Sequence, residues 1–207
     1  MKRFTLAAIC ALIVTGAAYA ADNLVINGKF DDYEDPLKGW TTDYRWSGSS
    51  IYANNHERIS VVPREGVYSK VCKLSGKKGY SEVRIESNPI KFEQNHQYTC
   101  NLDLKGGTTH LYFAGYKWKP GIRPHDDPKD GELRLIYKSK LEKVSSSGWK
   151  KVSFQIPGVN ASALSMKHMK YVRFIRVYAI TIGGKKDTFI DNVVVTKKPH
   201  TISGSLR

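Results

Sequence analysis

The sequence is a succession of short segments with strand character, and this pattern constrains the fold more than any other feature. In each segment, apolar, β-branched or aromatic residues alternate with polar ones at every second position, which is the period of a β-strand. The segments are residues 66–74, 79–85, 98–104, 133–137, 151–156 and 171–182. Turns rich in glycine or proline separate them, at 76–79, 88–89, 105–107, 157–158 and 183–184. Many short strands joined by such turns predict an all-β sandwich or jelly roll.

The first 20 residues have the features of a secretory signal peptide. Lys2 and Arg3 provide a positive start, residues 6–14 are apolar, and residues 18–20 read Ala-Tyr-Ala, a small-x-small cleavage site. The apolar run is too short for a membrane span, which needs about 20 apolar residues. We therefore expect a secreted or periplasmic protein whose mature part has no transmembrane segment.

The remainder predicts one domain followed by a short tail. Residues 21–198 fit a single unit, because all-β sandwiches of this size are common as one domain. Residues 162–170 are the one candidate for a short helix, and residues 199–207 are polar, which predicts a loose C-terminal tail. We expect a monomer.

The formal net charge of the chain is +14. Such a surplus favours anionic partners, for example an acidic or sulfated polysaccharide, and it also serves solubility alone. The lysines are scattered along the chain, and no helix-turn-helix, zinc-finger or ribonucleoprotein signature accompanies them. The pattern therefore disfavours nucleic acid as a partner.

Two cysteines, Cys72 and Cys100, remain after the signal peptide is removed with Cys10. In an oxidising compartment an even pair favours a disulfide. Both are in phase with apolar residues of their segments, so both are expected to face the core. The alternative, two buried free thiols that pack as small apolar side chains, stays open.

Matching strand motifs lie near the two ends of the mature chain. Residues 23–32 read NLVINGKFDD and are followed by Gly39-Trp40, and residues 189–195 read FIDNVVV. Between them, in order, come GVYSKVCKL at 66–74 and GWKKV at 148–152. These motifs resemble the secreted, CenC-like jelly-roll carbohydrate-binding modules found beside cellulases and xylanases. The resemblance implies a galactose-binding-like β-sandwich that binds sugar without catalysis.

The same resemblance implies a structural calcium ion where the first and last strands meet. The matching acids are Asp31, after the first motif, and Asp191, within the last. Calcium takes six to eight hard oxygen ligands, including carboxylates. The alternative is that both acids cap turns or pair with lysines. Another acidic stretch, residues 126–137, fails as an EF-hand because its third position is Pro128 and its twelfth is Tyr137.

Residues 111–125 interleave aromatic and basic side chains and end in a proline-rich stretch. Aromatic rings bind the apolar faces of sugars, and a basic side chain can pair with a uronate or sulfate group. The predicted sugar contacts are Trp46, Tyr116, Trp118, Arg123, Tyr137 and Arg176. The alternative is that these aromatics pack a long insertion against the sheet or stack on basic residues within the protein. Both interpretations stay open at this point.

Three functions are compatible with these patterns. We predict a non-catalytic protein that binds a polysaccharide or oligosaccharide. A jelly-roll polysaccharide lyase would need a Tyr or His base and a cation or amide for the uronate, and the candidates are Tyr116, His110, His125 and Arg123. A glycosidase would need two facing carboxylates, and the sequence offers no such pair. A structural or adhesive secreted protein without sugar binding is the third possibility.

Overall fold

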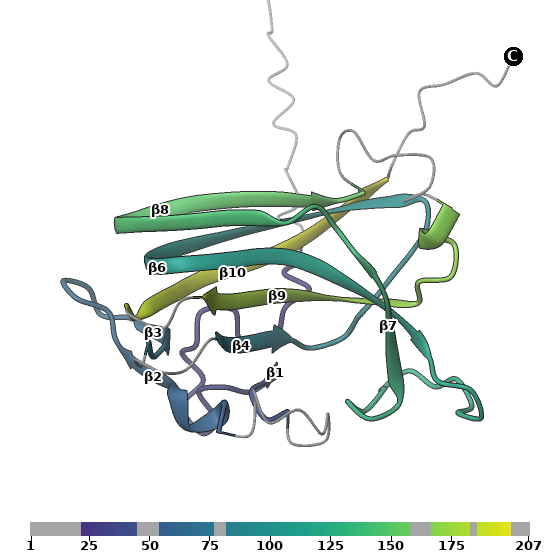
Figure 1. Cartoon of the computed structure of the whole chain (residues 1–207), viewed down its shortest axis with the longest axis horizontal. Coiled ribbons are helices and arrows are strands. Elements are labelled where there is room, and N and C mark those ends of the chain that lie inside the picture. Colours follow the sequence, from purple (N-terminus) through teal and green to yellow (C-terminus); the bar gives the residue numbers. More distant parts are fainter. Residues whose placement is uncertain (1–21, 45–53, 77–81, 158–166, 183–185, 200–207) are drawn as a thin grey trace, which may run out of the picture.

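The computed structural model describes residues 22–44, 54–76, 82–157, 167–182 and 186–199. Almost all regular structure in these ranges is β-strand (Figure 1). The strands are β1 (Trp40–Thr41), β2 (Ile59–Pro63), β3 (Lys70–Leu74), β4 (Glu82–Ser87), β5 (Ile90–Lys91), β6 (His96–Trp118), β7 (Leu133–Lys138), β8 (Glu142–Ile156), β9 (Phe174–Ile182) and β10 (Thr188–Pro199). Helical structure is limited here to a 3-10 turn, η3 (His56–Arg58), and one turn at 167–169. The all-β prediction is confirmed.

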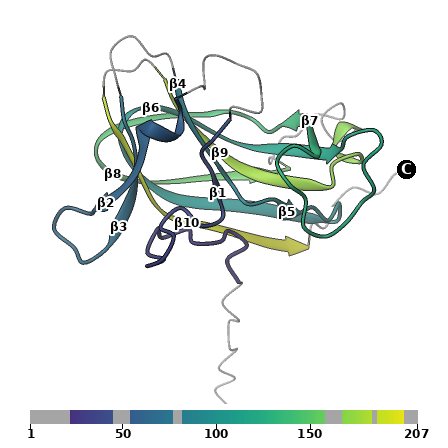
Figure 2. The same cartoon turned by 90° about the horizontal axis from the view of Figure 1, so that it is seen from below.

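The strands form one curled antiparallel sheet in the order β1-β4-β9-β6-β10-β3-β2, with β5 on β9 and both β7 and β8 on β6. Strand β6, 23 residues long, joins the two halves of this sheet. Its first part pairs with β10, whereas residues 109–116 pair with β9. The change of partner falls between Gly106 and Thr109. There the two halves separate and fold over a common core (Figures 1 and 2). This is the predicted jelly-roll sandwich.

Alternation along β6 decides which side chains enter the core. Leu102 and Leu104 from its first part, and Leu111 and Phe113 from its second part, are all buried in one cluster. Residues in the same phase of β3, β4, β9 and β10 join this cluster. Burial of so much apolar surface is the main force that holds the two halves together.

The two end motifs lie side by side. Leu24 N donates to Val195 O at 2.9 Å, and Val193 N donates to Gly28 O at 2.8 Å. The approach is close enough that a Cβ on Gly28 would lie 2.0 Å from Val193 O. The two end motifs therefore meet along β10. The prediction of a strand over the first motif is wrong, because residues 23–32 form turns: Asn27 and Phe30 have φ of 48° and 56°, which interrupts extended backbone.

Cys72 and Cys100 are buried free thiols, so the predicted disulfide is absent. Strand β10 separates them, because Cys72 pairs with Ile190 on one side and Cys100 pairs with Val195 on the other. Five residues of extended strand span about 16 Å, whereas a disulfide needs Cα atoms within about 7 Å. Burial raises the pKa of both thiols, so they remain protonated and act as small apolar side chains.

Several expectations lie wholly or mainly outside the described residues: the signal peptide, Trp46, most of the helix candidate and the tail beyond Pro199. In the part of the chain that the structure describes, no helix is long and apolar enough to cross a membrane.

Candidate functional site

The structure brings together three of the six predicted sugar contacts. Tyr116 and Trp118 on β6 and Arg176 on β9 share the face of the sheet that points away from the main core. Tyr137 on β7 lies in the opposite phase and packs against the main core. Arg123 is exposed in the loop that follows β6. The site predicted from sequence is thus divided among different parts of the molecule.

A second hydrophobic cluster covers that face of β6 and β9, and we call it the aromatic layer. Its members are Tyr112, Ala114, Tyr116, Leu133, Phe174 and Tyr178, with Trp118 and Ile180 packed against them. The rings of Tyr112 and Tyr178 stack at 4.9 Å, and Trp118 meets Phe174 edge-on at 5.4 Å. Tyr116 is only 8% exposed. Tyr116 therefore packs within the sheet's outer layer, which is the second of the two interpretations left open by the sequence.

A buried carboxylate, Glu86 on β4, lies against the aromatic layer. Tyr116 Oη donates to Glu86 Oε2 at 2.8 Å and lies 3.2 Å from the hydroxyl of Tyr178. Two guanidinium groups balance its charge, with Arg84 Nε at 3.5 Å and Arg176 Nη1 at 3.7 Å from its oxygens. Sequence reasoning missed Glu86. The signal that was present is its position in the polar phase of an alternating strand, beside Arg84.

Burial, and after it the negative charge of Glu86, raises the pKa of Tyr44, Tyr116 and Tyr178 well above the ordinary phenol value of about 10. A group whose pKa is raised in the folded state stabilises the fold below its unfolded pKa, and that stabilisation is lost as the pH rises further. We therefore expect these phenols to stay protonated in alkaline solution until the protein unfolds.

The measurement is a titration followed by phenolate absorbance and circular dichroism together. The phenolate signal should rise in two steps, the second coinciding with loss of the sheet signal. Complete ionisation of every tyrosine in a protein that keeps its native circular dichroism would contradict this expectation.

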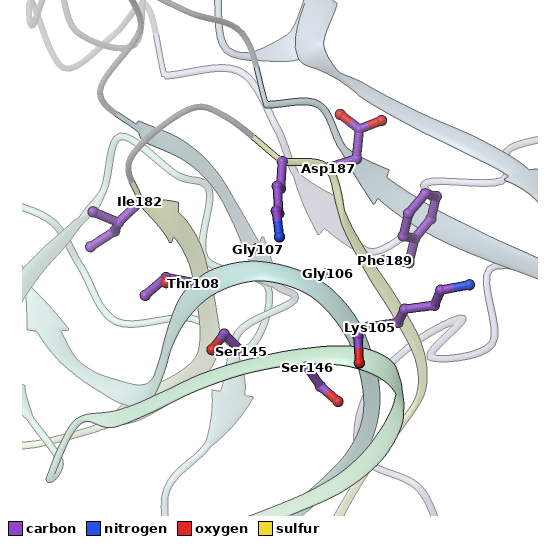
Figure 3. A pocket seen from close by; sticks show the side chains of 11 residues that line it. Lys105, Gly106, Gly107, Thr108, Ser145, Ser146, Ile182, Asp187 and Phe189 are labelled. Carbon is purple, nitrogen blue, oxygen red and sulfur yellow. The ribbon is translucent and has the colours of Figure 1, made fainter.

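An open hollow of about 730 Å³ lies beside the bend in β6 (Figure 3). Its lining comes from β6, β8, the end of β9 and the start of β10: Lys105, Gly106, Gly107, Thr108, Ser145, Ser146, Ser147, Ile182, Lys186, Asp187 and Phe189. A Cβ on Gly106 would lie 2.0 Å from Asp187 O. The missing side chain at that position is what allows β10 to pass so close to β6.

Hydroxyl groups dominate the wall of this hollow. Thr108, Ser145 and Ser146 carry them on two neighbouring strands (Figure 3), and Ser147 follows on β8. None of these side chains hydrogen-bonds to a residue that the structure describes. Such hydroxyls are free to donate to and accept from a bound molecule.

The charged residues of the hollow differ in whether they already have ion-pair or hydrogen-bond partners. Asp187 accepts from Gly76 N at 2.9 Å and pairs with Lys73 at 2.7 Å. Lys105 lies 3.4 Å from Glu65, and Lys186 makes no ion pair within the described ranges. Phe189 adds a partly exposed ring. The hollow therefore combines hydroxyls, ammonium groups and one apolar ring.

The described residues do not fit the calcium ion that the sequence predicts at Asp31 and Asp191. Both acids line one hollow, but Asp31 is exposed and Asp191 already accepts from Arg64 Nη1 at 2.6 Å. The same guanidinium lies 3.4 Å from Asp103. In the described ranges, no group of three or more acidic, histidine or cysteine side chains is placed to hold a metal. Arg64 supplies the positive charge instead.

No family model matches the sequence. No curated protein matches it either. Solved structures share the fold at low identity. A cyclase from Fischerella sp. TAU aligns with a TM-score of 0.51 at 12% identity, over 88% of this chain and 100% of that chain. The enzymatically active domain of bacteriophage CBA120 tailspike protein 4 gives 0.51 at 13% identity, over 85% of this chain and 21% of that one.

A family 16 carbohydrate-binding module gives a TM-score of 0.49 at 15% identity, over 84% of this chain and 99% of that chain. At such identities a structural likeness shows a common fold and nothing finer. The function therefore has to be argued from the site.

Proposed function

We propose that the protein is a secreted, non-catalytic carbohydrate-binding protein that holds a polysaccharide or oligosaccharide in the hollow of Figure 3. The observation that carries this proposal is a lining rich in hydroxyl residues, Thr108 and Ser145 to Ser147, none of which hydrogen-bonds to a described residue. Sugars present many hydroxyls of their own, which exchange hydrogen bonds with such a wall, and a ring like that of Phe189 can cover an apolar sugar face. The volume of about 730 Å³ lies in the usual range of ligand sites.

The lining residues favour binding over catalysis. Among them Asp187 is the one acid, and Lys73 and Gly76 already engage it. A glycosidase would need a second carboxylate across the hollow. A lyase would need a Tyr or His base, and no lining residue is of either type. Tyr116 is a poor alternative base, because burial and Glu86 raise its pKa and keep it protonated. The resemblance of the end motifs to carbohydrate-binding modules points the same way.

Two variants with truncated side chains test the site. We expect Phe189→Ala, and separately the double change Ser145→Ala with Ser146→Ala, to weaken glycan binding about tenfold each, the effect of losing one ring contact or two hydrogen bonds. The measurement is affinity electrophoresis against neutral and acidic polysaccharides, followed by calorimetry with the best binder.

Tyr171→Ala is the matched control, because it also removes an exposed ring, at a position outside the lining of the hollow. It should bind as the unaltered protein does. If no glycan retards the protein, or if the hollow variants bind as tightly as the control, the proposal is wrong.

A further inference from the structure

In the loop between β6 and β7, residues 119–132, one carboxylate contacts two side chains of the sheet. Asp130 Oδ1 accepts from Arg176 Nη2 at 2.6 Å, and Asp130 Oδ2 accepts from Thr41 Oγ1 at 3.0 Å. Arg176 Nη1 donates to Thr41 Oγ1 at 3.0 Å, which fixes the hydroxyl between them. Arg176 and Thr41 thus contact both oxygens of the carboxylate, the arrangement by which a guanidinium group and a neighbouring donor recognise any carboxylate.

Most other hydrogen bonds of this loop stay within it. Lys119 N donates to Glu132 O at 2.9 Å, and Lys129 N donates to the Glu132 carboxylate at 2.8 Å. A further tie to the sheet, between Asp126 and Lys91 at 3.5 Å, joins side chains that are 98% and 76% exposed. Exposed pairs of this kind contribute little. The loop also projects from the sheet beyond the start of β7 (Figure 1). Asp130 is therefore its main polar anchor.

The position that Asp130 occupies is reachable from solvent. Its side chain is 36% exposed and lines an open hollow of about 300 Å³, together with Trp40, Asn88 and Arg176. Arg176 itself is 3% exposed, and its Nε is buried without a hydrogen-bond partner among the described residues. A buried guanidinium with an unused donor is a strong attraction for an anion beside it.

The charges explain why a carboxylate is required there. Arg176 lies between two carboxylates, with its Nη1 3.7 Å from Glu86 Oε2 and its Nη2 2.6 Å from Asp130 Oδ1. Withdrawal of Asp130 leaves this nearly buried guanidinium without its short ion pair, which is costly. Any group that takes its place must restore one negative charge and offer two acceptor oxygens.

We propose that Arg176 and Thr41 form a carboxylate-binding site, that Asp130 occupies it in the free protein, and that the carboxylate of a uronic acid sugar exchanges with Asp130. The sugar ring would then lie in the adjoining hollow, against Trp40 and Asn88. The exchange conserves charge, because one carboxylate leaves and another enters. This site shares no lining residue with the hollow of Figure 3, so it stands whether or not glycan binds there.

Removal of the internal carboxylate is the direct test. Asp130→Asn and Asp130→Ala should bind trigalacturonate roughly tenfold more tightly than the unaltered protein, because the ligand no longer competes with the loop. Binding of uncharged galactotriose should not change. Asp126→Asn is the matched control, since it removes the same charge from the same loop but leaves Arg176 paired. The measurement is titration calorimetry with each variant at constant ionic strength.

Two binding results would overturn the proposal. One is that the Asp130 variants bind trigalacturonate no more tightly than the unaltered protein. The other is that acetate competes with trigalacturonate at the same concentration of carboxylate. The site would then recognise any carboxylate, and the sugar ring would contribute nothing to binding. A second measurement covers loss of stability: galacturonate should raise the melting temperature of Asp130→Ala above that in chloride of equal ionic strength, and should not do so for Asp126→Asn. Equal melting temperatures in both salts would also reject the site.

Discussion

Replacement of Gly106 by alanine is expected to lower the free energy of unfolding by about 4 kcal/mol, through backbone strain and steric overlap together. Gly106 has a φ of +120°, which side chains with a Cβ rarely adopt. The added Cβ would also lie 2.0 Å from Asp187 O and 2.9 Å from Thr188 Cα. Both are backbone atoms, one in the residue before β10 and one in its first residue, so neither can rotate away. Urea denaturation gives the free energy directly.

Two other glycines separate strain from overlap. Gly121 has a φ of +85° with open space around it, so Gly121→Ala should cost about 1 kcal/mol from backbone strain alone. Gly148 has open space and no such φ, so Gly148→Ala should leave stability nearly unchanged. If Gly106→Ala costs no more than Gly121→Ala, then β10 does not pass β6 as closely as the structure has it.

Replacement of Arg64 by alanine is expected to cost about 3 kcal/mol, because it leaves a buried carboxylate without its partner. Asp191 is 2% exposed, and Arg64 holds it at 2.6 Å while also lying near Asp103. The guanidinium group in addition covers the ring of Trp149 at 4.0 Å. Without Arg64 the two carboxylates repel each other. The control is Arg123→Ala, an exposed position where the same change should have an effect within about 0.5 kcal/mol.

The loss of stability in Arg64→Ala should depend on pH in a defined direction. Burial raises the pKa of Asp191 even with Arg64 beside it. A carboxyl of this kind stabilises the fold below its unfolded pKa of about 3.9, and loses that contribution as the pH rises through the folded value. Loss of Arg64 raises the folded value further. The deficit of Arg64→Ala should therefore be largest near neutral pH and shrink as acid protonates Asp191. A deficit that grows in acid would contradict this explanation.

The same pair bears on the calcium ion that the sequence predicts. Since Arg64 already supplies a positive charge to Asp191, we expect chelation to leave the melting temperature of the unaltered protein unchanged. A fall in melting temperature after chelation, restored by calcium alone, would show that the ion binds despite the guanidinium.

Much of the fold was predictable because period-two alternation is a local property of the backbone. In the first part of β6, Leu102 and Leu104 alternate with polar residues, and the apolar phase is the buried one. The second part of β6 has both faces covered, by the main core and by the aromatic layer. When both faces of a strand are buried, alternation does not show which face lies on the main core. The sequence therefore left open whether Tyr116 and Trp118 bind a ligand or pack.

The sequence by itself determined the all-β class and the strand character of the closing motif, since these depend on the residues of each segment. Only the tertiary structure decided which side chains meet. Arg64 reaches Asp191 across 127 positions, Tyr116 reaches Glu86 across 30, and the four hydroxyls of the hollow come from β6 and β8. The physical reason is that strand order and register set such neighbours. Both are selected by burial of the whole core, and no single segment carries that information.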